Sequence, residues 1–397
     1  MNIYFPDRLS DMDFEFSDEE KIFQENLREY FSKSLRPRLR EIDEKGIPKD
    51  FILDATKLGL WSLTFSEDVG GQHASFTLAS IAAEEIARSD FTMATAVFFL
   101  LENSWGYILD KYGSEELRKE VLPKVVSGEN FLGIASTEPT GGSDVANLKT
   151  SAKKEGGKYV INGEKAYISG VMEAKELGGG HLTLVRTGEK GHKGISIIYI
   201  PINLEGISVS KIENMGRMGI STGIIKYNNV KIDEKYLVGE ENKGFYYAMD
   251  GFNHARVLVA SACIGSAEAI LDEGLKYIKE REAFGVKLKD LQSIAFEAAE
   301  LYTKIEMARL LVYKSAWMLD NEEKFKSEIP KFSAMVKLIA PQTAFEVIKS
   351  VMMWFGAYGY TKDAVIEAGM RGLMSYLLGA EGALNVMKLI ISREILK

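Results

Sequence analysis

The spacing of apolar and polar residues along the chain changes period twice. Ser17 and Glu20 form a capping-box pattern, and apolar residues such as Phe23 and Leu27 then recur at helical spacing. Similar helical patterns continue to about Val126. The first third of the chain is therefore predicted to be helical.

Beyond Gly128 the period shortens to that of β-strands. The runs 158–161 and 164–169 flank Asn162-Gly163, a dipeptide typical of type I′ turns, so a hairpin is predicted there. Further strands are predicted at His181–Arg186, Gly194–Ile200 and Gly223–Lys231. The Gly-rich segment 171–180 is predicted to be a surface loop.

Helical spacing returns at Gly244 in long segments, for example over 267–278 and 305–312. The chain has 397 residues, more than one hydrophobic core usually holds. We predict an α+β fold, mostly α, with three domains: an N-terminal α-helical domain (1–128), a middle β-barrel or β-sandwich domain (129–240) and a C-terminal four-helix bundle (241–397). No flexible linker separates them, so a site is expected where they meet.

Composition excludes several classes of function. The chain has 49 Lys and Arg against 57 Asp and Glu, and this net charge of −8 disfavours nucleic-acid binding. The single cysteine, Cys263, excludes a disulfide framework, and the four scattered histidines predict no metal site. Residues Met1–Arg8 lack a leader pattern, so we expect a cytoplasmic protein without a membrane span.

The most unusual segment lies where the helical third gives way to the β third. Residues 137–144 read Thr-Glu-Pro-Thr-Gly-Gly-Ser-Asp, and the proline and glycines force a tight turn that exposes backbone N–H groups and hydroxyls. Such an array of donors suits a flavin edge or a phosphate. Turn-residue clusters also join domains without binding a ligand. No Gly-x-Gly-x-x-Gly or phosphate-loop motif supports a Rossmann or ATPase reading.

The sequence Thr-Glu-Pro-x-x-Gly-Ser-Asp resembles the signature loop of the acyl-CoA dehydrogenase family. The resemblance continues, in the family's order, at Val160–Lys165, Asn214–Gly216, Ser221-Thr222, Asn229-Val230, Arg281–Gly285, Gln292, Phe355–Tyr360, Glu381-Gly382 and Ile391–Glu394. It thus spans nearly the whole chain. It implies FAD-dependent α,β-dehydrogenation of an acyl-CoA thioester to a 2-enoyl-CoA.

The resemblance also implies where FAD is held. The isoalloxazine ring and adjoining groups would contact Ile134, Ser136, Thr137, Gly142, Ser143, Tyr167 and Ser169, and the adenine dinucleotide part, commonly of a neighbouring subunit, would contact Arg281, Phe284 and Gln292. This arrangement implies a homotetramer built as a dimer of dimers. Without the motif, Arg281 is an ordinary exposed helix charge and Phe284 an ordinary packing residue. A guanidinium fork does pair well with pyrophosphate.

By the same resemblance Glu381 is the catalytic base that removes the α proton. Ser143, Asn253, Arg256 and Gly382 resemble the residues that contact substrate, although Arg256 could equally be a structural ion-pair partner. Relatives similar to isovaleryl-CoA dehydrogenase carry the base at the position of Ala255, which is apolar here and so supports Glu381. Without the family pattern, a glutamate before glycine usually caps or solvates a helix end. Burial beside flavin and thioester would raise its pKa toward neutrality and strengthen it as a base.

The sequence departs from the family pattern near the base. Ala380 and Ala383 replace a tyrosine and a threonine, and the stretch from Arg371 to Glu381 is one residue longer than usual. The smaller Ala380 should widen the pocket, so we hypothesise a branched, cyclic or otherwise bulky acyl group. The expected electron acceptor is electron-transferring flavoprotein. The alternatives are an acyl-CoA oxidase or flavin monooxygenase relative, or a non-catalytic acyl-CoA or flavin-binding protein; Glu381 argues against the monooxygenase.

Overall fold

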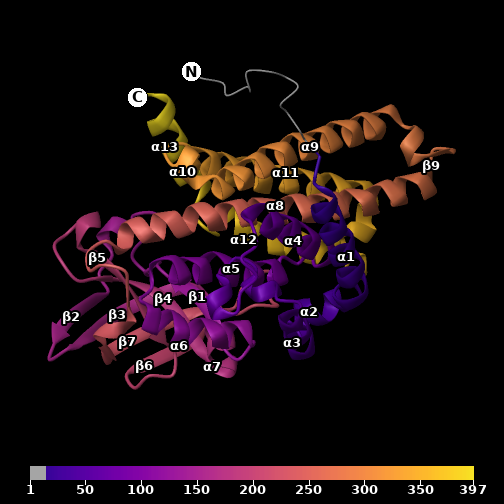
Figure 1. The fold of residues 1–397 in the computed structure, drawn as a ribbon. Helices are drawn as coiled ribbons and strands as arrows, with labels where there is room; N and C mark the ends of the chain where they lie inside the picture. The colour runs from indigo at the N-terminus through magenta and orange to yellow at the C-terminus, as the bar shows by residue number, and fades with distance from the viewer. Residues whose placement is uncertain (1–14) are drawn as a thin grey trace.

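The computed structural model describes residues 15–397. The segment Met1–Arg8, from which the absence of a leader was predicted, lies outside these residues. Along the described chain a helical region is followed by a β region and then by a second helical region (Figure 1). The predicted α+β order, mostly α, is therefore confirmed. The predicted domain boundaries at 128 and 240 stay predictions.

The N-terminal region consists of helices joined by short turns. They are α1 (Asp18–Ser34), α2 (Leu39–Lys45), α3 (Lys49–Lys57), α4 (Phe76–Ser89), α5 (Ala94–Tyr112) and α6 (Glu115–Val126). The capping box is present: the Glu20 N–H donates to Ser17 Oγ at 3.2 Å, and the Ser17 N–H donates to Glu20 Oε2 at 2.8 Å. These bonds satisfy donors that the first helical turn leaves free.

The middle region is an eight-stranded sheet with one added helix. Its elements are β1 (Phe131–Ala135), β2 (Ser151–Glu155), β3 (Lys158–Ser169), α7 (Val171–Leu177), β4 (Gly179–Arg186), β5 (Ile195–Pro201), β6 (Ile207–Lys211), β7 (Thr222–Asp233) and β8 (Leu237–Val238). The pairing order is β6-β7-β3-β2-β4-β5-β8, and β1 pairs with β4 in parallel. The three strands predicted over 181–231 are confirmed as β4, β5 and β7.

The hairpin turn predicted at Asn162-Gly163 is wrong. β3 continues through both residues without ending. The turn lies instead at Gly156-Gly157, where φ is 57° at Gly156 and 78° at Gly157. The register with β7 shifts between Ile161 and Gly163, which marks a β-bulge. A Cβ on Gly163 would lie 2.6 Å from Thr150 Cα, so this glycine serves a close backbone approach.

The surface loop predicted over 171–180 is also wrong, because its first seven residues form helix α7. Val171 and Ala174, three positions apart, are both buried and give the helix an apolar face against the sheet. The Glu173 carboxylate accepts a 2.9 Å hydrogen bond from the Ser221 N–H and a second bond from the Ser221 hydroxyl. The segment is therefore fixed to the chain between β6 and β7.

The C-terminal region is a bundle of long helices, as predicted. Its elements are α8 (Gly244–Glu280), the hairpin β9 (Glu282–Ala283) and β10 (Val286–Lys287), α9 (Gln292–Asp320), α10 (Glu322–Phe325), α11 (Ile329–Phe355), α12 (Ile366–Leu378) and α13 (Leu384–Ile395). α11 packs against α8, α9, α12 and α13, while α4 and α5 cover the other side of α8 (Figure 1). α8 thus runs through the centre of the protein.

α8 is apolar on all sides over much of its length, and every residue from 251 to 267 is buried. By length and composition alone it could cross a membrane, and it is the only such helix among residues 15–397. Of its most apolar window, 94% is buried inside the protein. A helix that is hydrophobic all round and enclosed by other helices is typical of a protein core.

Candidate active site

The loop after β1 is fixed from behind by a buried ion pair. The Glu138 and Gly141 backbones exchange two 3.1 Å hydrogen bonds, which close the tight turn. Glu138 Oε1 accepts from the Thr150 N–H at 2.8 Å and lies 3.1 Å from Lys165 Nζ. Lys165 Nζ also donates to the Ser136 carbonyl oxygen at 3.0 Å. Pro139 and the glycines make the turn, while Glu138 and Lys165 hold it in place.

This ion pair stays charged at neutral pH. Burial lowers the pKa of Lys165 to about 8, although Glu138 opposes the change. Burial also acts to raise the pKa of Glu138, but Lys165 and the Thr150 N–H outweigh it and hold that pKa below its usual value. Removing either partner would leave an uncompensated buried charge.

The open side of the loop carries the residues predicted to contact the flavin ring. Ser136 and Thr137 are half-buried, Gly142 and Ser143 are exposed, and Ile134 is buried at the end of β1. The Ala166 N–H donates to the Thr137 carbonyl at 2.9 Å and ties the loop to β3, which carries Tyr167 and Ser169. The structure therefore places the loop beside the end of β3 that carries Tyr167 and Ser169.

This edge fits a large planar cofactor such as FAD. Tyr167 is 66% exposed although it is aromatic, and its φ of 60° is in the left-handed region, which costs free energy. An ideal Cβ on Gly141 would meet no atom within 4 Å, so the turn opens onto free space. An exposed ring, open backbone and hydroxyls that have no partner among residues 15–397 together offer stacking and hydrogen bonds to a flavin.

The second set of predicted FAD residues lies far from this edge. Arg281, Phe284 and Gln292 are all exposed and flank the β9–β10 hairpin at the far end of α8. Phe284 is 95% exposed with φ 55°. At 1.5 Å per residue, the helical path from Arg256 to Arg281 is about 37 Å. Figure 1 shows β9 and β3 at opposite ends of the molecule, so one chain does not bring the two sets together.

Glu381 lies in a sharp turn that follows α12. Its φ of 56° and the φ of 118° at Gly382 turn the chain back, and the Gly382 N–H donates to the Gly379 carbonyl at 2.9 Å. Arg256 Nε donates to the Glu381 carbonyl oxygen at 3.1 Å. Among residues 15–397, no group accepts from the Glu381 N–H or donates to its carboxylate. Both groups are free to act on a ligand.

The environment of Glu381 makes its carboxyl group a stronger base than usual. Burial raises its pKa to about 7, against the opposing effect of Arg256, Lys337 and Arg217. The side chain is half-buried, and no described residue donates a hydrogen bond that would stabilise its charge. A carboxyl group with a pKa near neutrality suits general-base work.

Asn253 and Arg256 lie on the buried stretch of α8 that faces Glu381. Arg256 Nη1 donates to Asn253 Oδ1 at 3.2 Å, and burial lowers the pKa of Arg256 to about 10. Arg256 has no ion-pair partner within 4 Å among the described residues, so it is not a simple structural ion pair. Ala255 is fully buried and offers no second base.

Three further cations near these sites were not predicted from the sequence. Lys165 holds the loop, Lys337 donates to the Tyr376 carbonyl oxygen, and Arg217 lies buried between β6 and β7. A signal was available for Lys337, since a lone lysine in an apolar helical run has to be buried with a partner. Arg217 lies in a turn of mixed composition with two glycines and carried no such signal.

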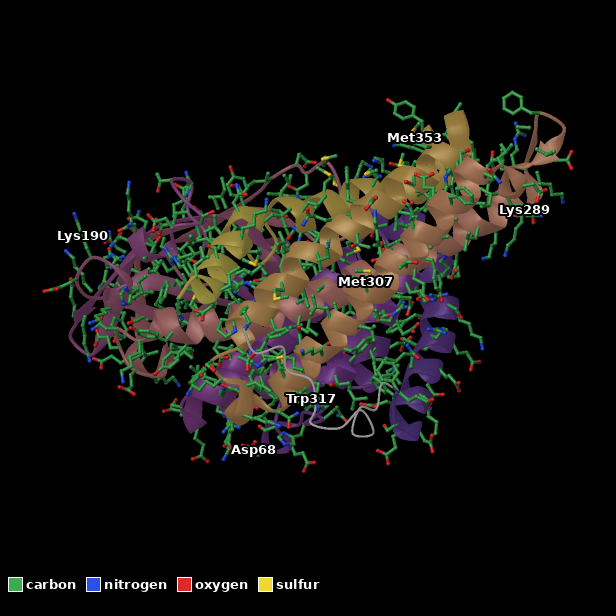
Figure 2. The ribbon with its side chains drawn as sticks, turned by 90° about the horizontal axis from the view of Figure 1, so that it is seen from above. Asp68, Lys190, Lys289, Met307, Trp317 and Met353 are labelled. Carbon is green, nitrogen blue, oxygen red and sulfur yellow. The ribbon has the colours of Figure 1, made fainter. Side chains whose placement is uncertain are left out.

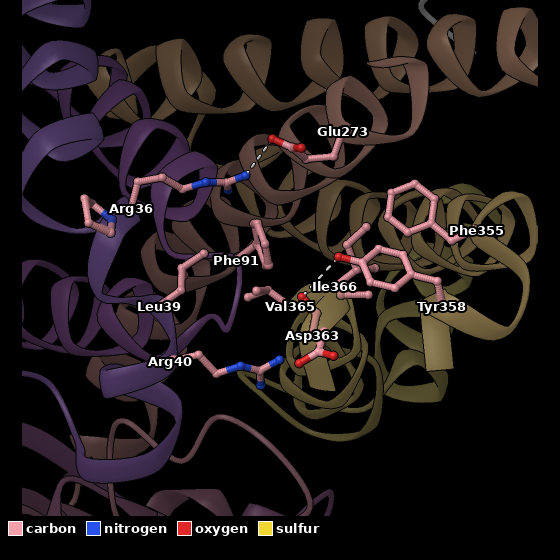
Figure 3. A pocket seen from close by; sticks show the side chains of 12 residues that line it. Arg36, Leu39, Arg40, Phe91, Glu273, Phe355, Tyr358, Asp363, Val365 and Ile366 are labelled. Carbon is pink, nitrogen blue, oxygen red and sulfur yellow. Dashed lines mark hydrogen bonds and ion pairs between the residues drawn. The ribbon is translucent and has the colours of Figure 1, made fainter. Parts of the chain in front are cut away.

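The two cavities that stand out on the surface lie elsewhere. One, of about 280 Å³, lies between α2, α8 and the segment that joins α11 to α12 (Figure 3). Its arginines are already paired: Arg36 bonds Glu273 at 2.8 Å and Arg40 bonds Glu367 at 2.8 Å. The other lies on the outer face of β2, β3 and β7 and is lined mostly by exposed polar residues. Neither includes Glu381 or the loop.

Comparison with known families accounts for nearly all of the chain. The models of the acyl-CoA dehydrogenase N-terminal, middle and C-terminal domains match residues 17–129, 133–230 and 242–396. The chain belongs to the acyl-CoA dehydrogenase family. As a member it is an oxidoreductase that acts on CH–CH groups of acyl-CoA substrates, and FAD is its cofactor.

Individual relatives show how broad this family is. The chain is 34% identical to mitochondrial isobutyryl-CoA dehydrogenase of Dictyostelium discoideum, over 96% of this chain and 90% of that one. It is 33% identical to the CarC subunit of the caffeyl-CoA reductase-Etf complex of Acetobacterium woodii, over 96% and 99%. The solved glutaryl-coenzyme A dehydrogenase glutaryl-CoA complex is 30% identical, covers 97% of each chain and gives a TM-score of 0.91. This acyl-CoA dehydrogenase family therefore includes both dehydrogenases and reductases.

Proposed function

We propose that the chain converts an acyl-CoA thioester to its 2-enoyl-CoA, with Glu381 as the base that removes the α proton. The observation that carries the proposal is the Glu381 carboxylate, which is half-buried, lacks a hydrogen-bond donor among the described residues and has a pKa raised to about 7. Bound FAD would supply the hydride acceptor for the β carbon.

The residues around Glu381 would stabilise the charge that forms as the proton leaves. The thioester carbonyl gains negative charge at that moment, and the free N–H of Glu381 can donate to it. Arg256 binds the Glu381 carbonyl oxygen and so holds the turn that carries the base against α8. Lys337 adds a buried positive charge nearby. These fixed groups need little rearrangement during the reaction.

The proposed FAD site has two parts. Ile134, Ser136, Thr137, Gly142, Ser143, Tyr167 and Ser169 would hold the flavin ring, and Arg281, Phe284 and Gln292 of a neighbouring subunit would hold the adenine dinucleotide. We place substrate contacts at Ser143, Asn253, Arg256 and Gly382. The distance of about 37 Å along α8 supports a site shared between two chains.

The exposed apolar surface supports the proposed homotetramer. Large apolar side chains project from one face of α9, among them Phe296, Tyr302, Met307, Leu310 and Trp317. Figure 2 shows Met307 and Trp317 along this face, and Met353, 75% exposed, toward the end that carries Lys289. Apolar patches of this extent mark interfaces. We keep electron-transferring flavoprotein as the proposed acceptor, since a relative belongs to an Etf complex, and the cytoplasm as the proposed location.

We further propose that the acyl group is branched, cyclic or otherwise bulky. The side chain next to the base is Ala380, and the glycines at 379 and 382 add no bulk. Isobutyryl and caffeyl groups, named for two relatives, are branched and aromatic. The reverse reaction, reduction of an enoyl-CoA, is the second candidate because one relative is a reductase.

The test is the visible absorbance of the purified protein under anaerobic conditions, before and after straight, branched and cyclic acyl-CoAs are added. We expect one or two bulky thioesters to bleach the flavin. A colourless protein that cannot be loaded with FAD would overturn the proposal, and a wide preference for short straight chains would overturn the bulky substrate. Fast reoxidation by oxygen would favour an oxidase, and reoxidation by enoyl-CoA alone would favour the reductase direction.

A further inference from the structure

Arg217 is an unusual residue for the place it occupies. Its side chain is only 8% exposed, and its φ of 58° is in the left-handed region that residues with a side chain rarely adopt. A buried cation and a strained backbone are both costly, and such features persist where function requires them. The turn from Asn214 to Ser221 therefore carries a strained, buried guanidinium.

The hydrogen bonds of Arg217 leave its guanidinium largely unsatisfied. Nη2 donates to Thr222 Oγ1 at 3.0 Å, and buried Nε has no partner among the described residues. No carboxylate oxygen of residues 15–397 lies within 4 Å of the Arg217 nitrogens. Burial lowers the pKa of Arg217. A guanidinium nevertheless keeps its proton inside proteins, so the group is charged.

Arg217 belongs to the surroundings of Glu381. The two side chains interact electrostatically, as do Arg217 and Tyr376, which lies on α12 five positions before the base. The turn is held against α12, because Arg371 Nη1 donates to the Met215 carbonyl oxygen at 3.2 Å. For Glu381 to reach the α carbon of a substrate, the acyl group must lie beside the Glu381 carboxylate. Arg217 is thus near the place of the acyl group.

The charges around this place do not balance. Arg217, Arg256 and Lys337 are buried cations whose described hydrogen bonds all go to neutral oxygens. The carboxylates that face Arg217 are Glu381 and Glu173, and the Glu173 carboxylate already binds Ser221. Burial raises the pKa of Tyr376 well above its usual value, so this phenol is neutral. Among the described residues, the buried positive charges here therefore outnumber the negative ones by one.

We propose that Arg217 binds a carboxylate on the acyl group, so that the preferred substrate is the CoA monothioester of a dicarboxylic acid. A carboxylate matches the planar fork of a guanidinium and would occupy the free Nε. The phosphates of CoA are separated from the reacting carbons by the whole pantetheine arm, so they do not supply this charge. The inference rests on the proposed function, because Glu381 fixes where the acyl group lies.

The test compares thioesters that differ only in charge. The CoA monothioesters of 3-methylglutaric, 3-methyladipic and 3-methylpimelic acids, which keep the branched acyl group proposed above, are each paired with the monomethyl ester of the same acid, and kcat/KM is measured with an artificial electron acceptor. We expect the free carboxylate to be preferred at least tenfold at one length. Arg217→Met should abolish that preference, mainly through KM, and Arg217→Lys should keep part of it. Arg393→Met, which removes an exposed arginine, is the control.

Each outcome supports or overturns the proposal. A wild-type protein that prefers the methyl esters at all three lengths, or a preference unchanged in Arg217→Met, would overturn it. If Arg217→Met does not fold or retain FAD, the wild-type ratio and the Arg217→Lys variant decide the question. A protein whose flavin no acyl-CoA bleaches would overturn the proposed function itself, whereas bleaching by neutral thioesters alone would overturn only the role of Arg217.

Discussion

The two ends of α8 are built in opposite ways. At the end near Arg256 the functional groups are buried, held by hydrogen bonds and strongly shifted in pKa. At the end near Arg281 they are exposed, and Phe284 has almost no contact with its own chain. The contacts at the first end are all made within one chain. The second end needs another surface to be useful.

Among variants that test this contrast between the two ends of α8, Glu381→Gln should have the largest effect on activity. Loss of the base is expected to lower kcat about 10³-fold, because a positioned general base typically contributes 10²–10⁴-fold. FAD content and oligomeric state should not change, as read by flavin absorbance and light scattering. Glu205→Gln, which alters an exposed glutamate far from the site, is the control. Equal activity of the two variants would move the base elsewhere.

Lys165→Met should have the next largest effect, because it leaves Glu138 buried without its cation. The expected loss in the free energy of unfolding is about 3 kcal/mol, measured by urea denaturation. The loop should also loosen and release FAD more readily. Lys153→Met, at an exposed site on β2, should change the stability by less than about 0.5 kcal/mol. Equal stability of the two variants would show that the ion pair is not needed.

The raised pKa of Glu381 predicts that kcat/KM depends on pH through the buried end of α8, near Arg256. Only the ionised carboxylate can accept the proton, so kcat/KM should fall about tenfold per unit below about pH 7. The folded protein also binds this proton more tightly than the unfolded chain. Glu381→Gln should therefore gain stability relative to wild type as the pH rises from about 4.5 to about 7. A flat rate profile between pH 5 and pH 7 would contradict the assignment.

Phe284→Ala should have the smallest effect on the chain itself. An exposed side chain contributes little to folding, so the free energy of unfolding should change by less than about 0.5 kcal/mol. Assembly or FAD retention should weaken by about tenfold if a partner covers this residue. Tyr246→Ala, at the opposite end of α8, should leave both unchanged. Full assembly and FAD retention in Phe284→Ala would make the far end irrelevant to the site.

The contrast also explains what could be predicted from the sequence. Helix starts such as Ser17 and the strands from 181 to 231 were predictable because local spacing and capping decide them. The dipeptide Asn162-Gly163 led to a wrong prediction of a hairpin turn. In the fold Gly163 allows a close approach to Thr150, which is a tertiary contact, and the strand forms a bulge there. α7 was missed because its glycines mark its end, where a Cβ on Gly179 would lie 2.1 Å from the Phe131 carbonyl oxygen.

The candidate site shows the same limit. The residue at position 381 could be named from a motif, but its raised pKa depends on burial in the fold, which outweighs the opposing effect of cations brought from α8, α11 and the turn after β6. Arg217 could not be recognised in the sequence, since its proposed role depends on burial in the fold and on an Nε that finds no acceptor among residues 15–397. Spacing along a chain describes local structure, whereas unsatisfied charge exists only in three dimensions.

The unbroken length of α8 also restricts how sequences of this kind can diverge. Each inserted or deleted residue between Arg256 and Arg281 would rotate the far end by about 100° and shift it by about 1.5 Å. Such a change would turn Arg281 and Phe284 away from their present direction while leaving Glu381 untouched. We therefore expect homologous chains to vary in length at the turn between β4 and β5 and not within this stretch of helix.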